Sequence, residues 1–300
     1  MARYSGARMP VEAVHLSAFS DSLARSGAPR SLREAPLEGL GRLGALVIDF
    51  PYFDHFPLGV LRYLLKRPTA RSVYGDLLHH GTPVALATAL LARVRTLRAT
   101  PGTRDAGERV LALALGYVSH LAVDRTLHPL VNRLARARAA RLGGDPLHQH
   151  TEVEKFQSVL FHEERLGFDF MGEPALRAHI AVDAHAIHRD AALRAAFIEA
   201  MGAAIGRAPS PRLLKRWARG YRQYVWLVSS PVGKTIVPEA IKREVRDEVY
   251  GGSWGTFVAA YGEAVGASRE ALDAALALAE SSEAAARFDR ILPEGPIDHG

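Results

Sequence analysis

The sequence predicts an all-α protein, a single multi-helix domain of about ten helices that spans residues 1–300. Two observations predict this class. Apolar residues recur at helical spacing along most of the chain, and no segment alternates apolar and polar residues for long enough to predict a strand. No internal repeat with a period of roughly 20 to 50 residues is evident, so a solenoid is not expected. The hydrophobic content of 48% is ordinary for a globular chain.

Glycine- and proline-rich breaks separate the predicted helices. Apolar spacing predicts helices over 10–26, 83–97, about 107–140, 146–160 and 268–287. Loops are expected over 27–37 and after Leu292, and Pro51 and Pro57 interrupt any helix between 40 and 57. Residues from about 165 onward are expected to form additional packing helices. No apolar run reaches the roughly 20 residues that span a bilayer.

Three residues of metal-ligating types lie four apart within the predicted helix that ends near residue 140. At 100° per residue, His120, Asp124 and His128 fan over about 80° of one helix face, so their side chains point into one space. Imidazole nitrogen and carboxylate oxygen are donors that Zn²⁺ takes. A buried imidazole or carboxylate also needs a partner. We therefore predict a metal site here, in preference to two core histidines and a capping aspartate.

Two earlier segments carry further candidate ligands. Asp49 ends an apolar run and is followed by a cluster of aromatic residues, which suits a carboxylate held beside a metal. His79 and His80 are adjacent and lie before Gly-Thr-Pro. Because the side chains of adjacent residues diverge, at most one of these two histidines is expected to reach the site, and we prefer His79.

The segment after Pro146 contains two overlapping His-x-x-x-Glu pairs. One pair is His148 with Glu152, and the other is His150 with Glu154. The helix face of the first pair continues through apolar residues at 156 and 159, which indicates a face turned to the core. We therefore prefer His148 and Glu152 as ligands, with His150 and Glu154 as the alternative.

Composition limits the chemistry and the partners. The chain has no cysteine, so disulfides, thiolate chemistry and cysteine-bound zinc are excluded. The first ten residues lack the apolar core of a secretory signal, which predicts a cytoplasmic protein. The net charge of +6 and pI near 9.7 favour anionic partners, although solvated arginine-rich helix faces account for them as well.

A basic and aromatic segment spans residues 212–246. It contains nine Lys or Arg residues and two acidic residues, together with Trp217, Tyr221, Tyr224 and Trp226. Basic residues interleaved with aromatic ones are typical of a face that binds nucleic acid or a membrane. An amphipathic helix whose arginines extend into solvent is the alternative, and we prefer it.

With these motifs in view, the chain resembles the zinc-dependent phospholipase C family, whose all-helical fold is similar to that of the P1-type nucleases. The resemblance spans residues 15 to 152. It rests on His15, the Gly-Ala-Leu-Val-Ile-Asp run over 44–49, His79, the Gly-Tyr-Val-Ser-His-Leu-Ala-Val-Asp run over 116–124 with the following His128-Pro, and the His-Gln-His-Thr-Glu run over 148–152.

The resemblance implies a cluster of zinc ions. One ion is expected on Asp49, His79, His120 and Asp124, and a second on His128, His148 and Glu152. In the family, the counterpart of Asp124 also bridges to a third zinc, which the counterpart of His15 holds together with the processed amino-terminal residue. Because Met1 lies well ahead of His15, two zinc ions are expected here, with three as the alternative.

The resemblance also implies phosphodiester hydrolysis, in which water activated by the metal attacks phosphorus. Asp49 is the expected catalytic base, and Phe50, Tyr52 and Phe53 are expected to line the substrate mouth. The implied substrate is a phospholipid or another phosphodiester. Peripheral contact with an acidic membrane surface fits the basic charge, and nucleic acid is the less favoured partner.

Two other functions compete with hydrolysis. The first is a non-catalytic scaffold or binding protein that keeps the fold and the metal. The second is a different helical metalloprotein, such as a carboxylate-bridged di-iron protein or a histidine-aspartate phosphohydrolase. The sequence disfavours the second, because it has no His-Asp dipeptide and because the Glu-x-x-His pattern of di-iron bundles occurs near the site only at Glu12 and His15.

Overall fold

The computed structural model describes residues 12–56, 58–59, 61, 72–143, 146–167, 171–236, 239–249 and 254–297, and some side chains within these ranges, His148 among them, lie outside the description. The described residues form fourteen α-helices and three 3-10 helices and contain no strand, so the all-α prediction is confirmed. The helices in excess of the predicted ten are mostly short. The elements are α1 (Glu12–Arg25), η1 (Arg30–Arg33), α2 (Leu37–Val47), η2 (Phe50–Phe53), α4 (Val73–His80), α5 (Pro83–Ala99), α6 (Arg104–Leu142), α7 (Pro146–Leu166), α8 (Pro174–Ile180), α9 (Ala186–Arg189), α10 (Ala191–Ile205), α11 (Pro211–Val228), α12 (Gly233–Ile236), α13 (Glu239–Val249), α14 (Trp254–Glu280), η3 (Ser282–Ala284) and α15 (Ala285–Ile291).

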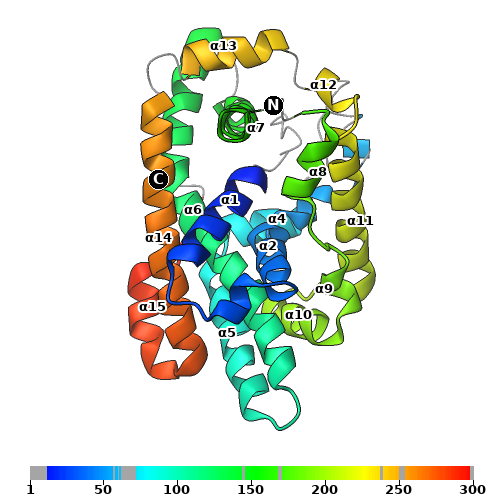
Figure 1. Cartoon of the computed structure of the whole chain (residues 1–300), viewed down its shortest axis with the longest axis vertical. Coiled ribbons are helices and arrows are strands. Elements are labelled where there is room, and N and C mark those ends of the chain that lie inside the picture. Colours follow the sequence, from blue (N-terminus) through cyan, green and yellow to red (C-terminus); the bar gives the residue numbers. More distant parts are fainter. Residues whose placement is uncertain are drawn as a thin grey trace.

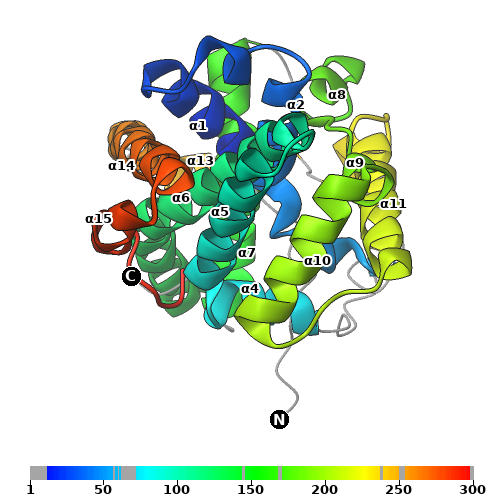
Figure 2. The same ribbon diagram turned by 90° about the horizontal axis from the view of Figure 1, so that it is seen from below.

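Helix α6 is the centre of the fold. It is 39 residues long and packs against α2, α5, α7 and α14 (Figure 1). Seen from below, α5 and α6 lie in the middle, with α14 and α15 on one side and α10 and α11 on the other (Figure 2). The run from Val110 to Asp124 is buried without interruption, because helices surround it on every side.

The length and composition of α6 suffice to cross a membrane, which corrects the sequence prediction that no run is long enough. However, 89% of its most apolar 18-residue window is buried inside the protein. A helix at the centre of a folded core has the same composition, so this is weak evidence for a membrane span.

Glycines allow α2 to approach α6 unusually closely. A Cβ atom on Gly116 would lie 1.8 Å from the carbonyl oxygen of Gly41, and one on Gly44 would lie 2.0 Å from that of Leu113. Any side chain at these positions would therefore push the two helices apart. The close approach brings the carbonyl group of Ala45 within 2.8 Å of the His120 ring, so it also sets the position of a candidate ligand.

The carboxy-terminal helices share the core with the rest of the chain. The predicted helix over 268–287 in fact begins at Trp254, and α14 packs along α6 and α1. Its Phe257 and Leu272 are fully buried, and Ser268 Oγ lies 2.8 Å from Ser119 Oγ on α6. One cluster of buried hydrophobic side chains runs from Ala13 to Ile297. The helices after residue 165 therefore contribute to the same core as those before it.

Candidate metal centre

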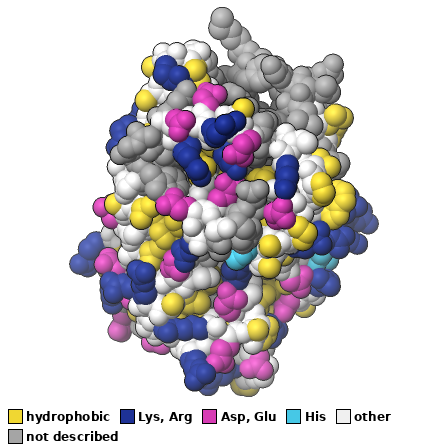
Figure 3. Space-filling model, turned by 45° about the horizontal axis from the view of Figure 1, so that its top comes forward, with side chains coloured by type: hydrophobic (Ala, Val, Ile, Leu, Met, Phe, Trp, Pro, Cys, Tyr) yellow, Lys and Arg dark blue, Asp and Glu magenta, His cyan; other side chains and the backbone are white. Residues whose placement is uncertain are grey.

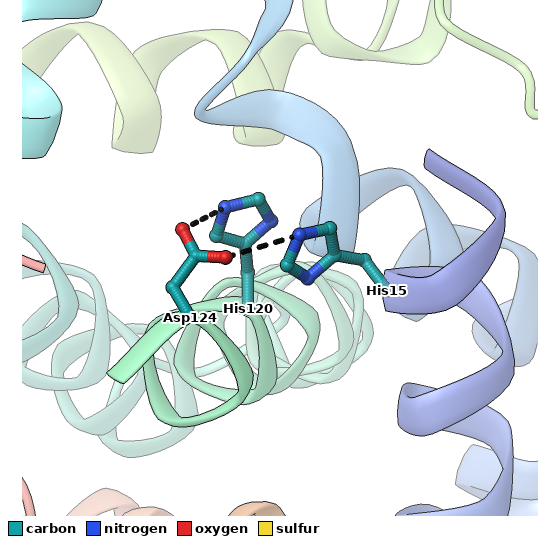
Figure 4. Close-up of side chains that lie close together, drawn as sticks. All are labelled: His15, His120 and Asp124. Carbon is teal, nitrogen blue, oxygen red and sulfur yellow. Dashed lines mark ion pairs between the residues drawn. The ribbon is translucent and has the colours of Figure 1, made fainter. Parts of the chain in front are cut away.

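Five buried side chains from four segments meet beside the middle of α6. His15 comes from α1, Asp49 follows α2, His79 comes from the end of α4, and His120 and Asp124 come from α6; each is at most 6% exposed. The two carboxylate oxygens of Asp124 face different histidines: Oδ1 lies 3.1 Å from His15 Nε2, and Oδ2 lies 3.0 Å from His120 Nε2 (Figure 4). Asp49 Oδ1 lies 3.2 Å from His79 Nε2. These residues form two possible metal-binding groups that share His120.

A second cluster lies one helical turn further along α6. His128 Nε2 and His150 Nε2 lie 3.0 and 3.1 Å from Glu154 Oε1. The two imidazole rings are 5.2 Å apart and nearly perpendicular, as expected for two rings that converge on one point from different helices. His128 Nε2 also lies 3.6 Å from Asp124 Oδ1. Asp124 therefore lies between the two clusters.

Hydrogen bonds orient four of these histidines in the same way. The Nδ1–H group of His120 donates to the carbonyl of Ala45 at 2.8 Å, and that of His79 donates to the carbonyl of Gly75 at 2.9 Å. In the second cluster, His128 Nδ1–H donates to the carbonyl of Ile297 at 3.1 Å. With the proton on Nδ1, each Nε2 atom keeps its lone pair and points toward the carboxylates. The fourth ring follows the same rule: His150 Nδ1 lies 2.8 Å from Asn132 Oδ1.

The charges of the first cluster depend on one another. Burial disfavours the ionised carboxylate of Asp124, but the nearby His120, His128 and His15 outweigh burial and hold its pKa well below the usual range. Burial likewise opposes a charged His120, yet Asp124 and Asp49 raise the pKa of this ring to about 9. For His15, burial prevails and lowers the pKa. In the second cluster, His150 and His128 outweigh burial and lower the pKa of Glu154. Asp124 and Glu154 are thus anionic and attract positive charge.

The donor set fits zinc. Every candidate ligand is an imidazole nitrogen or a carboxylate oxygen, and both are donors that Zn²⁺ takes. Two of the ring nitrogens, His120 Nε2 and His15 Nδ1, are buried without a hydrogen bond of good geometry, although His120 Nε2 lies 3.0 Å from Asp124 Oδ2. A buried nitrogen without a partner is costly unless something else satisfies it. A metal ion beside Asp124 would satisfy His120 Nε2. Carbonyl groups behind the rings are also the usual support for histidine ligands.

Among the described residues, the pair from α7 that meets His128 is His150 with Glu154, the alternative of the two pairs considered from the sequence. His150 and Glu154 join His128, whereas Glu152 is not part of this group and the side chain of His148 lies outside the described residues. The preference for 148 and 152 assumed that only their face turns to the core. In fact α7 is buried on several faces, with Val153 at 0% and Gln157 at 1% exposure, so apolar continuation does not discriminate between the two registers.

Of the other predicted site residues, some lie at the site and some do not. His79 is 4% exposed and faces Asp49, while His80 is exposed. Phe50 and Phe53 do not line an open mouth: both are buried, and their rings pack against Tyr221 of α11 at 5.0 and 5.3 Å. This part of the prediction was wrong, because the aromatic cluster anchors α11. Tyr52 does lie at the site, with its hydroxyl 3.3 Å from His79 Nδ1.

Four supporting groups were missed by sequence reasoning, one of which is the carbonyl of Gly75 behind His79. The other three are Asn132, which orients His150, and the main-chain carbonyls of Ala45 and Ile297. Asn132 lies four residues after His128 and could have been considered on that spacing. Carbonyl groups carry no signal in the sequence, because every residue has one.

The comparisons with known proteins agree with this arrangement. The sequence matches the family described as zinc dependent phospholipase C over residues 42–205, a range that includes both clusters except His15. No curated protein and no solved structure matches the chain. The family depends on zinc, and several His/Asp groups here can hold metal ions, which supports Zn²⁺ as the cofactor with more than one ion. With the match covering more than half of its length, the chain belongs to the zinc-dependent phospholipase C family.

Proposed function

We propose that the protein is a zinc-dependent phosphodiester hydrolase and that its substrate is a phospholipid. The observation that carries the proposal is the position of Asp124. Its two oxygens face His15 and His120 in one cluster and, at 3.6 Å, His128 in the other. A carboxylate shared in this way can bridge neighbouring metal ions, and paired ions are the usual machinery for displacement at phosphorus.

The ligand assignment follows the two clusters. Asp49, His79, His120 and Asp124 would hold one zinc ion, and His128, His150 and Glu154 a second; His15, beside Asp124, is available to a third. When bound, the ions supply water of lowered pKa and neutralise charge on the phosphate and on the leaving oxygen. The carbonyl and amide groups behind the rings fix the direction of each Nε2 lone pair.

Asp49 is the candidate catalytic base. It is the one carboxylate of the first cluster that is not shared between the two clusters, and it lies at the end of α2 with its Oδ1 atom 3.2 Å from His79 Nε2. Its carboxylate would accept the proton of the attacking water as the phosphorus–oxygen bond forms. His79 and the hydroxyl of Tyr52, 3.3 Å from the His79 ring, would hold the orientation of this corner of the site.

Metal content provides the first test. The purified protein is expected to carry about two divalent ions per chain, mainly zinc, and His120→Ala is expected to lose metal and stability together, because ligand residues form a site only in the folded chain. Elemental analysis and thermal melts with and without a chelator measure both. A well-folded protein with substoichiometric metal and a melting temperature that chelation does not change would contradict the metal assignment.

Turnover provides the second test. Asp49→Asn keeps the side-chain volume and removes the charge, so hydrolysis of a chromogenic phosphodiester and of a short-chain phosphatidylcholine should fall roughly 10²-fold or more. Asp289→Asn, an exposed residue of α15, is the matched control and should keep full activity. If the fully metallated wild type hydrolyses neither substrate, the alternative of a non-catalytic metal-containing scaffold is favoured. The predicted cytoplasmic location is a separate proposal, which cell fractionation tests.

A further inference from the structure

One face of α11 is a continuous strip of exposed cations. Its side chains recur at helical spacing within about 120° of arc and extend over about 15 Å of helix. In Figure 3, Lys and Arg side chains gather along the right edge of the molecule, where Figure 1 places α11. The strip, called the basic face below, consists of Arg212, Lys215, Arg216, Arg219 and Arg222.

The charge of the basic face is largely uncompensated. Residues 211–228 contain no Asp or Glu. Arg216 forms an ion pair with Asp54, but the other four cations form no ion pair with any residue that the structure describes. Some arginines elsewhere on the surface are paired, as Arg98 is with Glu108 at 2.9 Å. Four unpaired cations held on one rigid helix produce a local positive potential, which attracts an extended anionic surface.

An exposed aromatic residue lies at the carboxy-terminal end of the basic face. Trp226 is 61% exposed, and Val232, just beyond the helix, is 51% exposed. A pocket of about 600 Å³ opens beside Trp226, and its mixed apolar and polar lining includes Arg177, Arg222 and His185. His185 Nε2 is buried there without a hydrogen-bond partner. Asp183, also in the lining, is paired with Arg189 at 2.8 Å. This end thus offers an exposed indole ring beside a pocket that contains one buried ring nitrogen without a hydrogen-bond partner.

We propose that the basic face of α11 docks the protein on a bilayer that contains anionic phospholipids, with Trp226 at the level of the headgroups. A flat, charged surface can contact all cations of one helix face at once, and indole rings favour the boundary between headgroups and acyl chains. The proposal deepens the proposed function, because it places a phospholipid hydrolase on its substrate. The docking itself does not depend on catalysis.

The burial of the other aromatic residues argues against nucleic acid as the partner. Proteins that bind single strands use several exposed rings on which successive bases stack. Here Trp217, Tyr221 and Tyr224 lie on the buried face of α11 and are at most 7% exposed. The rings of Tyr221 and Tyr224 contact η2, as Tyr224 does with Phe53 at 5.1 Å, and Trp217 packs against Tyr74 of α4 at 5.2 Å. One exposed indole at the end of the helix does not form a stacking platform, but it does suit a membrane boundary.

Vesicle binding tests the proposal. Each Lys or Arg near an anionic surface strengthens binding roughly 5-fold, so Arg219→Gln/Arg222→Gln should weaken binding to vesicles with one-third phosphatidylglycerol by roughly 25-fold. The matched control is Arg133→Gln/Arg136→Gln, which removes two exposed cations from α6 and should bind as the wild type does. Wild-type binding should also weaken in high salt and be small on pure phosphatidylcholine. Equal losses in both double variants would overturn the proposal.

Quenching by brominated acyl chains tests the position of Trp226. The chain has three tryptophans, and the wild-type fluorescence should be quenched on vesicles, whereas that of Trp226→Phe should not. Equal quenching in both proteins, or duplex DNA that binds the wild type more tightly than the vesicles, would refute membrane docking by this face. Hydrolysis of dispersed short-chain phosphatidylcholine by the wild type is measured in parallel. Vesicle binding without hydrolysis refutes the proposed function alone, and hydrolysis without vesicle binding refutes the docking alone.

Discussion

A chain that ends at Pro293 would lose the contacts by which the carboxy-terminal tail supports the candidate metal centre. The N–H group of Ile297 donates to the carbonyl of His79 at 3.0 Å, and the carbonyl of Ile297 accepts from His128 Nδ1–H at 3.1 Å. The tail therefore connects a ligand of the first cluster with one of the second. Glu294 adds a further anchor, because its carboxylate accepts from two N–H groups at the start of α5 at 2.7 and 3.2 Å.

The expected loss can be worked out contact by contact. The two hydrogen bonds of Ile297 contribute about 1 kcal/mol each. Burial of its side chain, which is 1% exposed, contributes about 2 kcal/mol, and the Glu294 cap about 1 kcal/mol. The truncation should thus lower the free energy of unfolding by about 5 kcal/mol. Loss of the carbonyl behind His128 should also weaken zinc binding roughly 10- to 100-fold.

Competition with a chromophoric chelator measures zinc affinity, and urea denaturation measures stability. A chain that ends at Asp298 is the matched control, because it keeps Ile297 and both of its backbone hydrogen bonds. Ile297→Ala separates the two effects: it should cost about 2 to 4 kcal/mol of stability while zinc affinity stays close to that of the wild type, since the carbonyl remains. A folded Pro293 chain with unchanged zinc affinity would refute the reasoning.

Three further predictions concern the register, the helix contact and the pH response. Glu154→Gln should lower metal content by about one ion per chain while Glu152→Gln leaves it unchanged; elemental analysis showing the reverse would restore the register preferred from the sequence. Gly116→Ala should destabilise the protein by roughly 3 kcal/mol in urea denaturation, since its Cβ atom would lie 1.8 Å from a backbone oxygen. The control is Gly262→Ala, whose Cβ atom would have no atom within 4 Å and which should be neutral or stabilising. Equal effects of the two substitutions would argue against the close approach of α2 and α6. Burial lowers the pKa of His162 to about 4. As the pH falls from 6.5 to 4, the unfolded chain therefore takes up a proton at this residue that the folded chain does not, and the free energy of unfolding falls by about 3 kcal/mol. His162→Leu should lose this part of the pH dependence, and denaturation curves as steep in pH as those of the wild type would contradict the assignment.

Local spacing was enough to predict the elements that carry their own pattern. The helix with His120, Asp124 and His128 was predicted within a few residues of its observed bounds, because one helix face at a spacing of four is a property of that segment alone. The choice of His79 over His80 also agrees with the geometry, since one of two adjacent side chains faces the core. The absence of cysteine limited the donors to imidazole and carboxylate.

The sequence by itself determined the all-α class, the zinc-dependent phospholipase C family and the types of metal donor in this protein. Only the tertiary structure shows that His150 and Glu154 of α7 meet His128. Both His-x-x-x-Glu pairs have the same internal geometry, and the choice depends on the rotation of α7 about its axis, which its packing against α6 determines. It also decided that Ile297, 169 residues from His128, orients that ring. Contacts between distant segments depend on how whole helices pack, and no local pattern in the chain encodes them.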